Sequence, residues 1–129
     1  MADTKKRILV ADDDPDLIDL LKMDLSMLGY DIIVATNGKE ALQMAMTEPV
    51  DLVVLDVMMP YIDGYHVAYE VTSKLGAKAP KILLITSRDT SREKGIALMS
   101  GASEVLQKPL DMEALHAKFK EIIEGNVKK

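Results

Sequence analysis

The chain has 129 residues, 48% hydrophobic and 29% charged, which suits one globular domain with a single core and argues against disorder. Its formal net charge of −5 argues against direct contact with nucleic acid, because phosphate contacts need Lys and Arg. Cysteine is absent, residues 1–7 lack an apolar signal segment, and no apolar run approaches about 20 residues. We therefore expect no disulfides, no thiolate metal site, no membrane contact and a cytoplasmic location.

The first half of the chain contains two predicted strand–helix units. Residues 7–11 form an almost wholly apolar run, which is typical of a strand buried on both faces. Residues 15–28 repeat leucine at helical spacing, and this pattern predicts a helix that ends at Gly29. A second strand is predicted at 31–36 and a second helix at 39–48.

The second half repeats the alternation three more times. Residues 51–56 form the most β-branched apolar run of the chain, so we predict that they are the central strand of the sheet. The remaining strands are predicted at 81–86 and 103–107, and the remaining helices at 65–75, 91–100 and 111–124.

Five strands that alternate with helices predict an α/β fold with a parallel sheet covered on both faces. We expect a single domain over 1–129, with a core at about 6–124 and a polar tail at 125–129. In such folds ligands bind beyond the carboxyl ends of the strands. The residues that follow each predicted strand are therefore the candidates for function.

Three consecutive aspartates follow the first strand. Asp14 precedes Pro15, and this pair predicts a helix cap followed by the first helical residue. Asp12 and Asp13 are then left to face the edge of the sheet. Asp56 ends the third strand, so three carboxylates are expected at this edge, where they cannot all stay ionised without a cation.

A hydroxyl and an amine are expected at the same edge. Thr86 ends the fourth strand and Lys108 follows the fifth. Oxygen donors without cysteine favour Mg²⁺, or Mn²⁺ as a substitute, over zinc. An aspartate that faces a metal, with an amine and a hydroxyl in reach, is a plausible nucleophile toward a phosphoryl group. The product would be an aspartyl phosphate.

Four segments of the sequence resemble the receiver domains of two-component response regulators, of the type found in single-domain chemotaxis regulators. They are ADDDP at 11–15, LDVMMPYIDG at 55–64, LLITSR at 83–88 and GASEVLQKP at 101–109, in the order and spacing of that family. The likeness extends from about Lys6 to Glu124. It implies a flavodoxin-like, doubly wound (βα)5 fold with strand order 2-1-3-4-5.

The resemblance also implies roles for the residues at the sheet edge. Asp56 would be the phosphoacceptor and one of the metal ligands. Asp13 would bind Mg²⁺ directly, Asp12 would act largely through metal-bound water, and the backbone carbonyl of Met58 would be a further ligand. These four residues form the predicted metal site.

The same resemblance bears on further positions. Thr86 and Lys108 would contact the phosphoryl group and complete the catalytic set with Asp56. The peptide bond between Lys108 and Pro109 would be cis. Val105 departs from the family, which often has Tyr or Phe there, and a valine has no ring to move inward when the threonine moves.

The predicted function is a phosphorylation switch rather than a metabolic enzyme. A histidine kinase or phosphotransfer protein would donate a phosphoryl group to Asp56, and the chain would catalyse its own phosphorylation and dephosphorylation. The change would alter a face for a downstream protein, made by the segments 91–100, 103–107 and 111–124. The chain would be a monomer or would dimerise on phosphorylation.

Two other functions remain open from the sequence. A magnesium-dependent phosphatase would usually have a second acid two residues after the nucleophile, where this chain has Met58. A receiver-like module that binds a partner constitutively would not need the acids, the threonine and the lysine together. Both a stand-alone regulator and a receiver cut from a longer protein agree with the sequence.

Overall fold

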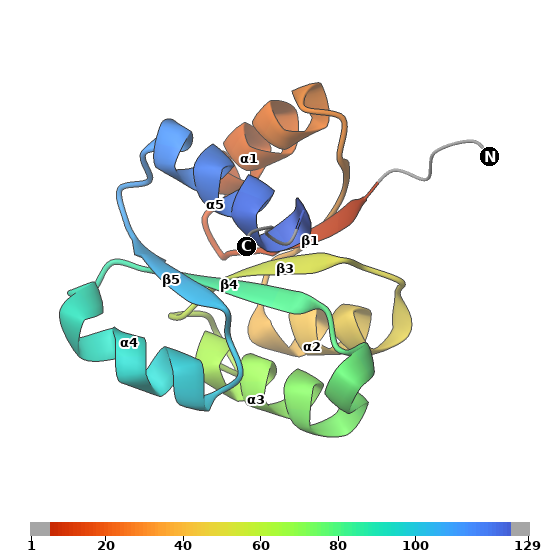
Figure 1. Cartoon of the computed structure of the whole chain (residues 1–129), viewed down its shortest axis with the longest axis vertical. Helices are drawn as coiled ribbons and strands as arrows, with labels where there is room; N and C mark the ends of the chain where they lie inside the picture. The colour runs from red at the N-terminus through yellow and green to blue at the C-terminus, as the bar shows by residue number, and fades with distance from the viewer. Residues whose placement is uncertain (1–5, 125–129) are drawn as a thin grey trace.

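The computed structural model describes residues 6–124, which form a parallel five-stranded sheet between two layers of helices (Figure 1). The polar tail predicted at 125–129 lies outside the described residues. The strands are β1 (Arg7–Ala11), β2 (Asp31–Ala35), β3 (Leu52–Asp56), β4 (Lys81–Thr86) and β5 (Glu104–Gln107). The helices are α1 (Pro15–Met27), α2 (Gly38–Thr47), α3 (Gly64–Leu75), α4 (Thr90–Met99) and α5 (Met112–Glu124), with a short 3₁₀ turn at Gly76–Lys78.

The strand order β2-β1-β3-β4-β5 confirms both the fold and the central position of β3. Every predicted strand and helix is present, with ends that differ from the prediction by no more than one residue. The 3₁₀ turn after α3 was not predicted, because a three-residue segment carries no periodic signal. No helix within residues 6–124 combines the length and the apolar character that a membrane span requires.

The two layers of helices explain why the strands are apolar on both faces. Helices α1 and α5 cover one face of the sheet, and α2, α3 and α4 cover the other (Figure 1). Along β1, Ile8 belongs to the apolar cluster that includes Phe119 of α5, whereas Leu9 belongs to the cluster that includes Val67 of α3. All four side chains lie in the core, and their burial drives the assembly of the two layers.

The strand register brings the functional ends of four strands to one edge. Ala11, the last residue of β1, lies opposite Leu55 of β3, and Asp56 lies opposite Ile85 of β4. Thr86, the last residue of β4, lies opposite Gln107 of β5. The segments that follow these strands therefore start beside one another, as the sequence predicted for a parallel sheet.

The start of α1 separates the three aspartates as expected. Asp14 caps the helix, because its side chain accepts a hydrogen bond from the Asp16 backbone N–H at 3.0 Å, and Pro15 is the first helical residue. Asp12 and Asp13 remain at the end of β1. The cap therefore fixes the direction in which the chain leaves the sheet edge.

Candidate functional site

Three carboxylates gather at the carboxyl edge of the sheet. Asp12, Asp13 and Asp56 each offer an oxygen, and these oxygens lie within 4.8 Å of one another. Asp12 is 0% exposed and Asp56 is 4% exposed, whereas Asp13 is open to solvent. Like charges this close repel strongly when water is excluded, so the cluster needs positive charge nearby.

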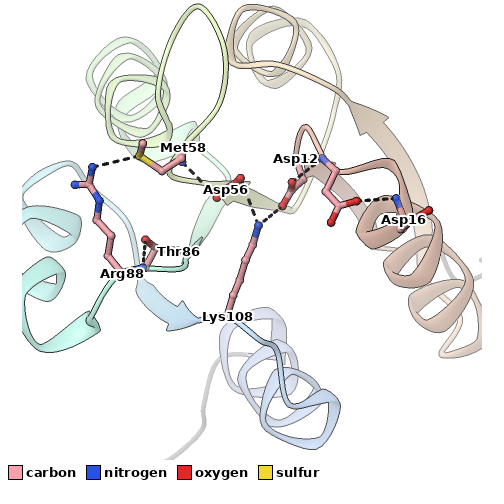
Figure 2. Close-up of polar contacts among 8 residues, drawn as sticks. Asp12, Asp16, Asp56, Met58, Thr86, Arg88 and Lys108 are labelled. Carbon is pink, nitrogen blue, oxygen red and sulfur yellow. Dashed lines mark hydrogen bonds and ion pairs between the residues drawn. The ribbon is translucent and has the colours of Figure 1, made fainter.

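Lys108 provides part of that charge from the end of β5 (Figure 2). Its Nζ lies 2.9 Å from Asp12 Oδ2 and 3.4 Å from Asp56 Oδ2. Burial by itself would lower the pKa of Lys108, but the hydrogen bond to Asp12 and the charges of both aspartates raise it above its ordinary value. The amine thus stays charged between the two buried acids. The Lys108–Pro109 peptide bond is cis, as the resemblance implied.

Asp12 and Asp13 differ in what their oxygens contact. Asp12 Oδ2 accepts from the Lys108 amine, and its Oδ1 accepts from the Asp14 backbone N–H at 2.9 Å. Both oxygens of Asp12 therefore already have donors, while the exposed carboxylate of Asp13 faces solvent beside them. The two neighbouring acids therefore differ in their surroundings, although each offers an oxygen to the same cluster.

The surroundings of Asp56 disfavour its ionised form. Burial, followed by the charge of Asp12, raises the pKa of Asp56 from 3.8 to about 6. Lys108 and the Met58 backbone N–H, which donates to Asp56 Oδ1 at 3.3 Å, act in the opposite direction but do not outweigh them. A carboxylate in this state gains from a cation that replaces its proton.

The raised pKa of Asp56 predicts that Asp56→Asn stabilises the metal-free chain. Between about pH 4 and 6 the folded chain holds a proton on Asp56 that the unfolded chain releases, so this contribution is present at low pH and is lost as the pH rises through about 6. Above that range the ionised carboxylate costs stability, and the amide does not. Urea denaturation in EDTA should give a gain of about 1–3 kcal/mol at about pH 7.5 and little gain at about pH 4. A gain that does not depend on pH would contradict the assignment.

Thr86 and Arg88 border the cluster on the β4 side. Thr86 is fully buried, and its Oγ1 accepts a hydrogen bond from the Arg88 backbone N–H at 3.0 Å. The Arg88 guanidinium extends toward the loop after β3, where Nη2 lies 3.4 Å from Met58 Sδ (Figure 2). Arg88 therefore connects the two loops on either side of Asp56.

Val105 occupies the core rather than a surface position. It is buried in the same apolar cluster as Val57, Ala97 and Ala102. Its side chain therefore lies in the core and carries no aromatic ring.

The loop between β3 and α3 is held against the start of α2. The Gly38 backbone N–H donates to Pro60 O at 3.3 Å, and a Cβ at position 38 would lie 1.7 Å from Ile62 O. Tyr61 between them has a φ of 73°, which is strained for a residue with a side chain. This close approach positions the loop that carries Met58.

We expect Gly38→Ala to push this loop away from α2, because the added methyl group meets a backbone carbonyl that cannot rotate aside. The free energy of unfolding should fall by about 1–3 kcal/mol, as for other overpacked sites. Gly95→Ala is the matched control, since a Cβ there meets nothing within 4 Å. In α4 this alanine should stabilise by about 0.5–1 kcal/mol. Urea denaturation of both variants tests the pair, and equal effects would contradict the expectation.

Two residues near the site were not singled out from the sequence. The Tyr65 hydroxyl in α3 donates a hydrogen bond to Glu93 Oε1 in α4, and Glu93 is nearly buried. In the sequence, Glu93 lies four residues before Ala97 and seven before Ser100, a spacing that places the three on one face of a helix. All three are buried, so this spacing could have identified Glu93 as an inward-facing acid. An acid on the inner stripe of a helix requires a partner.

Comparisons with known proteins agree with this geometry. The sequence model of the response regulator receiver domain matches residues 8–120. The chain is 38% identical over 118 residues to the alkaline phosphatase synthesis transcriptional regulatory protein PhoP of Bacillus subtilis, covering 92% of this chain and 48% of PhoP. It is 40% identical over 117 residues to the response regulator MprA of Mycolicibacterium vanbaalenii, covering 91% of this chain and 50% of MprA. The chain thus spans about half the length of these curated relatives.

Solved structures give the same result. The response regulator protein TrrA from Thermotoga maritima, in complex with Mg²⁺–BeF, aligns with a TM-score of 0.81 and 38% identity over 91% of this chain and 98% of that one. On the strength of the sequence match, the fold and the clustered acids, the chain belongs to the family of response regulator receiver domains, the signalling switches of two-component systems.

Proposed function

We propose that Asp56 is the phosphoacceptor of this receiver domain and that the chain catalyses its own phosphorylation with Mg²⁺. The observation that carries the proposal is the position of Asp56, a nearly buried carboxylate within 3.4 Å of Lys108 and in the same 4.8 Å cluster as Asp12 and Asp13. Its ionised form is disfavoured by its surroundings, and a bound cation would relieve that cost.

The donor set fits a magnesium ion. Three carboxylates, together with backbone carbonyls, offer the hard oxygen ligands that Mg²⁺ prefers, with Mn²⁺ as a substitute. As in the family to which the chain belongs, Asp13, Asp56 and the Met58 carbonyl would hold the ion directly, and Asp12, whose oxygens each accept one hydrogen bond, would act largely through metal-bound water. When bound, the ion would neutralise charge on the acids and on the incoming phosphoryl oxygens.

The side chains around Asp56 suit an in-line transfer. One oxygen of ionised Asp56 would form the bond to phosphorus while the bond between phosphorus and the donor breaks, and the electron pair would leave with the donor. Lys108 would hold one phosphoryl oxygen and Thr86 would donate its hydroxyl to another. Such a site works by positioning and by stabilising charge.

The donor would be a histidine kinase or a phosphotransfer protein, in the cytoplasm. An apolar hollow of about 490 Å³ adjoins Lys108 and offers a surface for it. Its lining includes Leu17 and Leu20 of α1, together with Pro109 and Leu110 beyond β5. A donor protein that covers this hollow would exclude water from the adjacent site.

The output would pass to a downstream protein at the face made by α4, β5 and α5, either on the monomer or through a phosphorylation-dependent dimer. Slow loss of the phosphoryl group by attack of water would end the signal. Met58 offers no group to orient that water, since its side chain is an exposed thioether.

Uptake of a phosphoryl group from acetyl phosphate tests the proposal. The intact mass of the chain should increase by one phosphoryl group with Mg²⁺ and should stay unchanged with EDTA. Release of many equivalents of phosphate from small phosphoesters would instead favour a phosphatase. No uptake under either condition would favour a module that binds its partner constitutively.

A further inference from the structure

Glu93 of α4 is a charged residue with almost no exposure that takes no part in the proposed metal or phosphoryl contacts. Its exposed fraction is 6%. A carboxylate in that environment needs donors or cations to offset its lost hydration. The Tyr65 hydroxyl of α3 donates to Oε1, and the Arg88 guanidinium lies 4.0 Å from Oε2. One side chain thus ties α4 both to α3 and to the loop after β4.

The hydroxyl of Tyr65 is firmly held as a donor. Burial, followed by the hydrogen bond to Glu93 and its negative charge, raises the pKa of Tyr65 well above its ordinary value. The contact joins residues 28 positions apart in the sequence, so it depends on the packing of α3 against α4. Its loss would leave an acid without its hydrogen-bond donor between two helices, which is costly.

Arg88 connects this pair to the sheet edge. Its backbone N–H donates to Thr86 Oγ1 at 3.0 Å, and its Nη2 lies 3.4 Å from the sulfur of Met58, two residues after Asp56 (Figure 2). The same guanidinium reaches Glu93 through Nη1. Arg88 is therefore placed between Glu93 and the pocket in which a phosphoryl group would be attached.

A phosphoryl group on Asp56 would attract both the Thr86 hydroxyl and the Arg88 guanidinium. It adds negative charge and acceptor oxygens beside Thr86 and Arg88. If the Thr86 hydroxyl turns toward it, the Arg88 backbone N–H loses its acceptor, and the guanidinium is attracted away from Glu93. Glu93 would then be a nearly buried carboxylate without its cation, which favours a movement of α4 that brings Glu93 into solvent and away from Tyr65.

We propose that Tyr65, Glu93 and Arg88 form a latch that holds α4 in the unphosphorylated chain, and that phosphorylation of Asp56 opens the latch by drawing Arg88 from Glu93. The inference rests on the proposed function of Asp56. It gives this chain a connection from the site to α4 that does not need a ring at Val105, which is already buried in the core.

Tyr65→Phe tests the latch, with Tyr69→Phe as the matched control, because Tyr69 lies on the same helix with its side chain largely exposed. Two quantities are measured on the full chain: amide hydrogen exchange across residues 90–99 without ligand, and the affinity for beryllofluoride, a stable stand-in for the phosphoryl group, at saturating Mg²⁺. Tyr65→Phe should raise the exchange and tighten beryllofluoride binding by about three- to tenfold each, since a weakened latch favours the open state. Tyr69→Phe should match the parent.

The affinity for beryllofluoride distinguishes a latch from a contact that only packs α3 against α4. A purely structural contact would loosen α4 without tightening the binding of beryllofluoride, and that result would overturn the proposal, as would equal behaviour of the two tyrosine variants. Glu93→Gln gives a second arm, because it keeps an acceptor for Tyr65 while removing the charge that holds Arg88, and it should also tighten binding. If the parent chain neither binds beryllofluoride nor takes up a phosphoryl group, the proposed function and the opening step both fail; if it does both and the variants match the control, only the latch fails.

Discussion

Asp56→Asn should abolish the uptake of a phosphoryl group from acetyl phosphate and Mg²⁺. The amide of Asn cannot act as the nucleophile, and of the other acids Asp12 already accepts hydrogen bonds from Lys108 and the Asp14 backbone, whereas Asp13 is open to solvent. We expect the labelled fraction, measured by intact mass and by mapping of the modified peptide, to fall by at least about a hundredfold. The folded state should persist, because the same substitution is expected to stabilise the metal-free chain.

Asp51→Asn is the matched control for this loss. Asp51 precedes the opposite end of β3, where its side chain accepts a hydrogen bond from the Arg7 backbone N–H at 2.8 Å. An asparagine can accept the same bond, so labelling should be unchanged. Persistent labelling of Asp56→Asn at the parent level, or transfer of the label to another residue, would refute the assignment of the phosphoacceptor.

Lys108→Met should destabilise the metal-free chain by about 2–4 kcal/mol at about pH 7.5, because it leaves Asp12 and Asp56 without their shared cation. Methionine keeps the apolar stem of the lysine, so the effect comes mainly from the lost charge. Mg²⁺ should restore much of the stability by binding the same acids in the folded chain. Acid should also reduce the deficit as Asp56 takes up a proton. Urea denaturation with and without Mg²⁺, at two pH values, measures all three effects.

Lys118→Met is the comparison for this variant. Lys118 also pairs with an acid at 2.9 Å, Glu104, but both side chains are partly exposed and lie away from the cluster. Its removal should cost no more than about 1 kcal/mol and should show no dependence on Mg²⁺. Similar losses in the two variants, or a failure of Mg²⁺ to restore Lys108→Met, would mean that Lys108 does not neutralise the cluster.

The fold was largely predictable because most strands are short apolar runs followed by a helix with an apolar stripe, although β5 and α4 carry weaker patterns. That pattern leaves a parallel sheet with covered faces as the arrangement that buries all five runs. The strand ends then predicted the convergence of Asp12, Asp13, Asp56, Thr86 and Lys108 at one edge, since parallel strands share their direction. The strand order came from the resemblance to receiver domains, because local periodicity does not specify which strands are neighbours.

The sequence by itself determined the elements, their parallel arrangement and the set of polar residues at the functional edge. These features depend on residue type and on position along the chain. Only the tertiary structure decided which oxygens Lys108 pairs with, how far burial disfavours the charge of Asp56, and that Glu93 is enclosed between Tyr65 and Arg88. These properties depend on the distances between side chains that come from separate elements. They also depend on how completely the packing excludes water from those side chains. No local sequence pattern encodes either quantity.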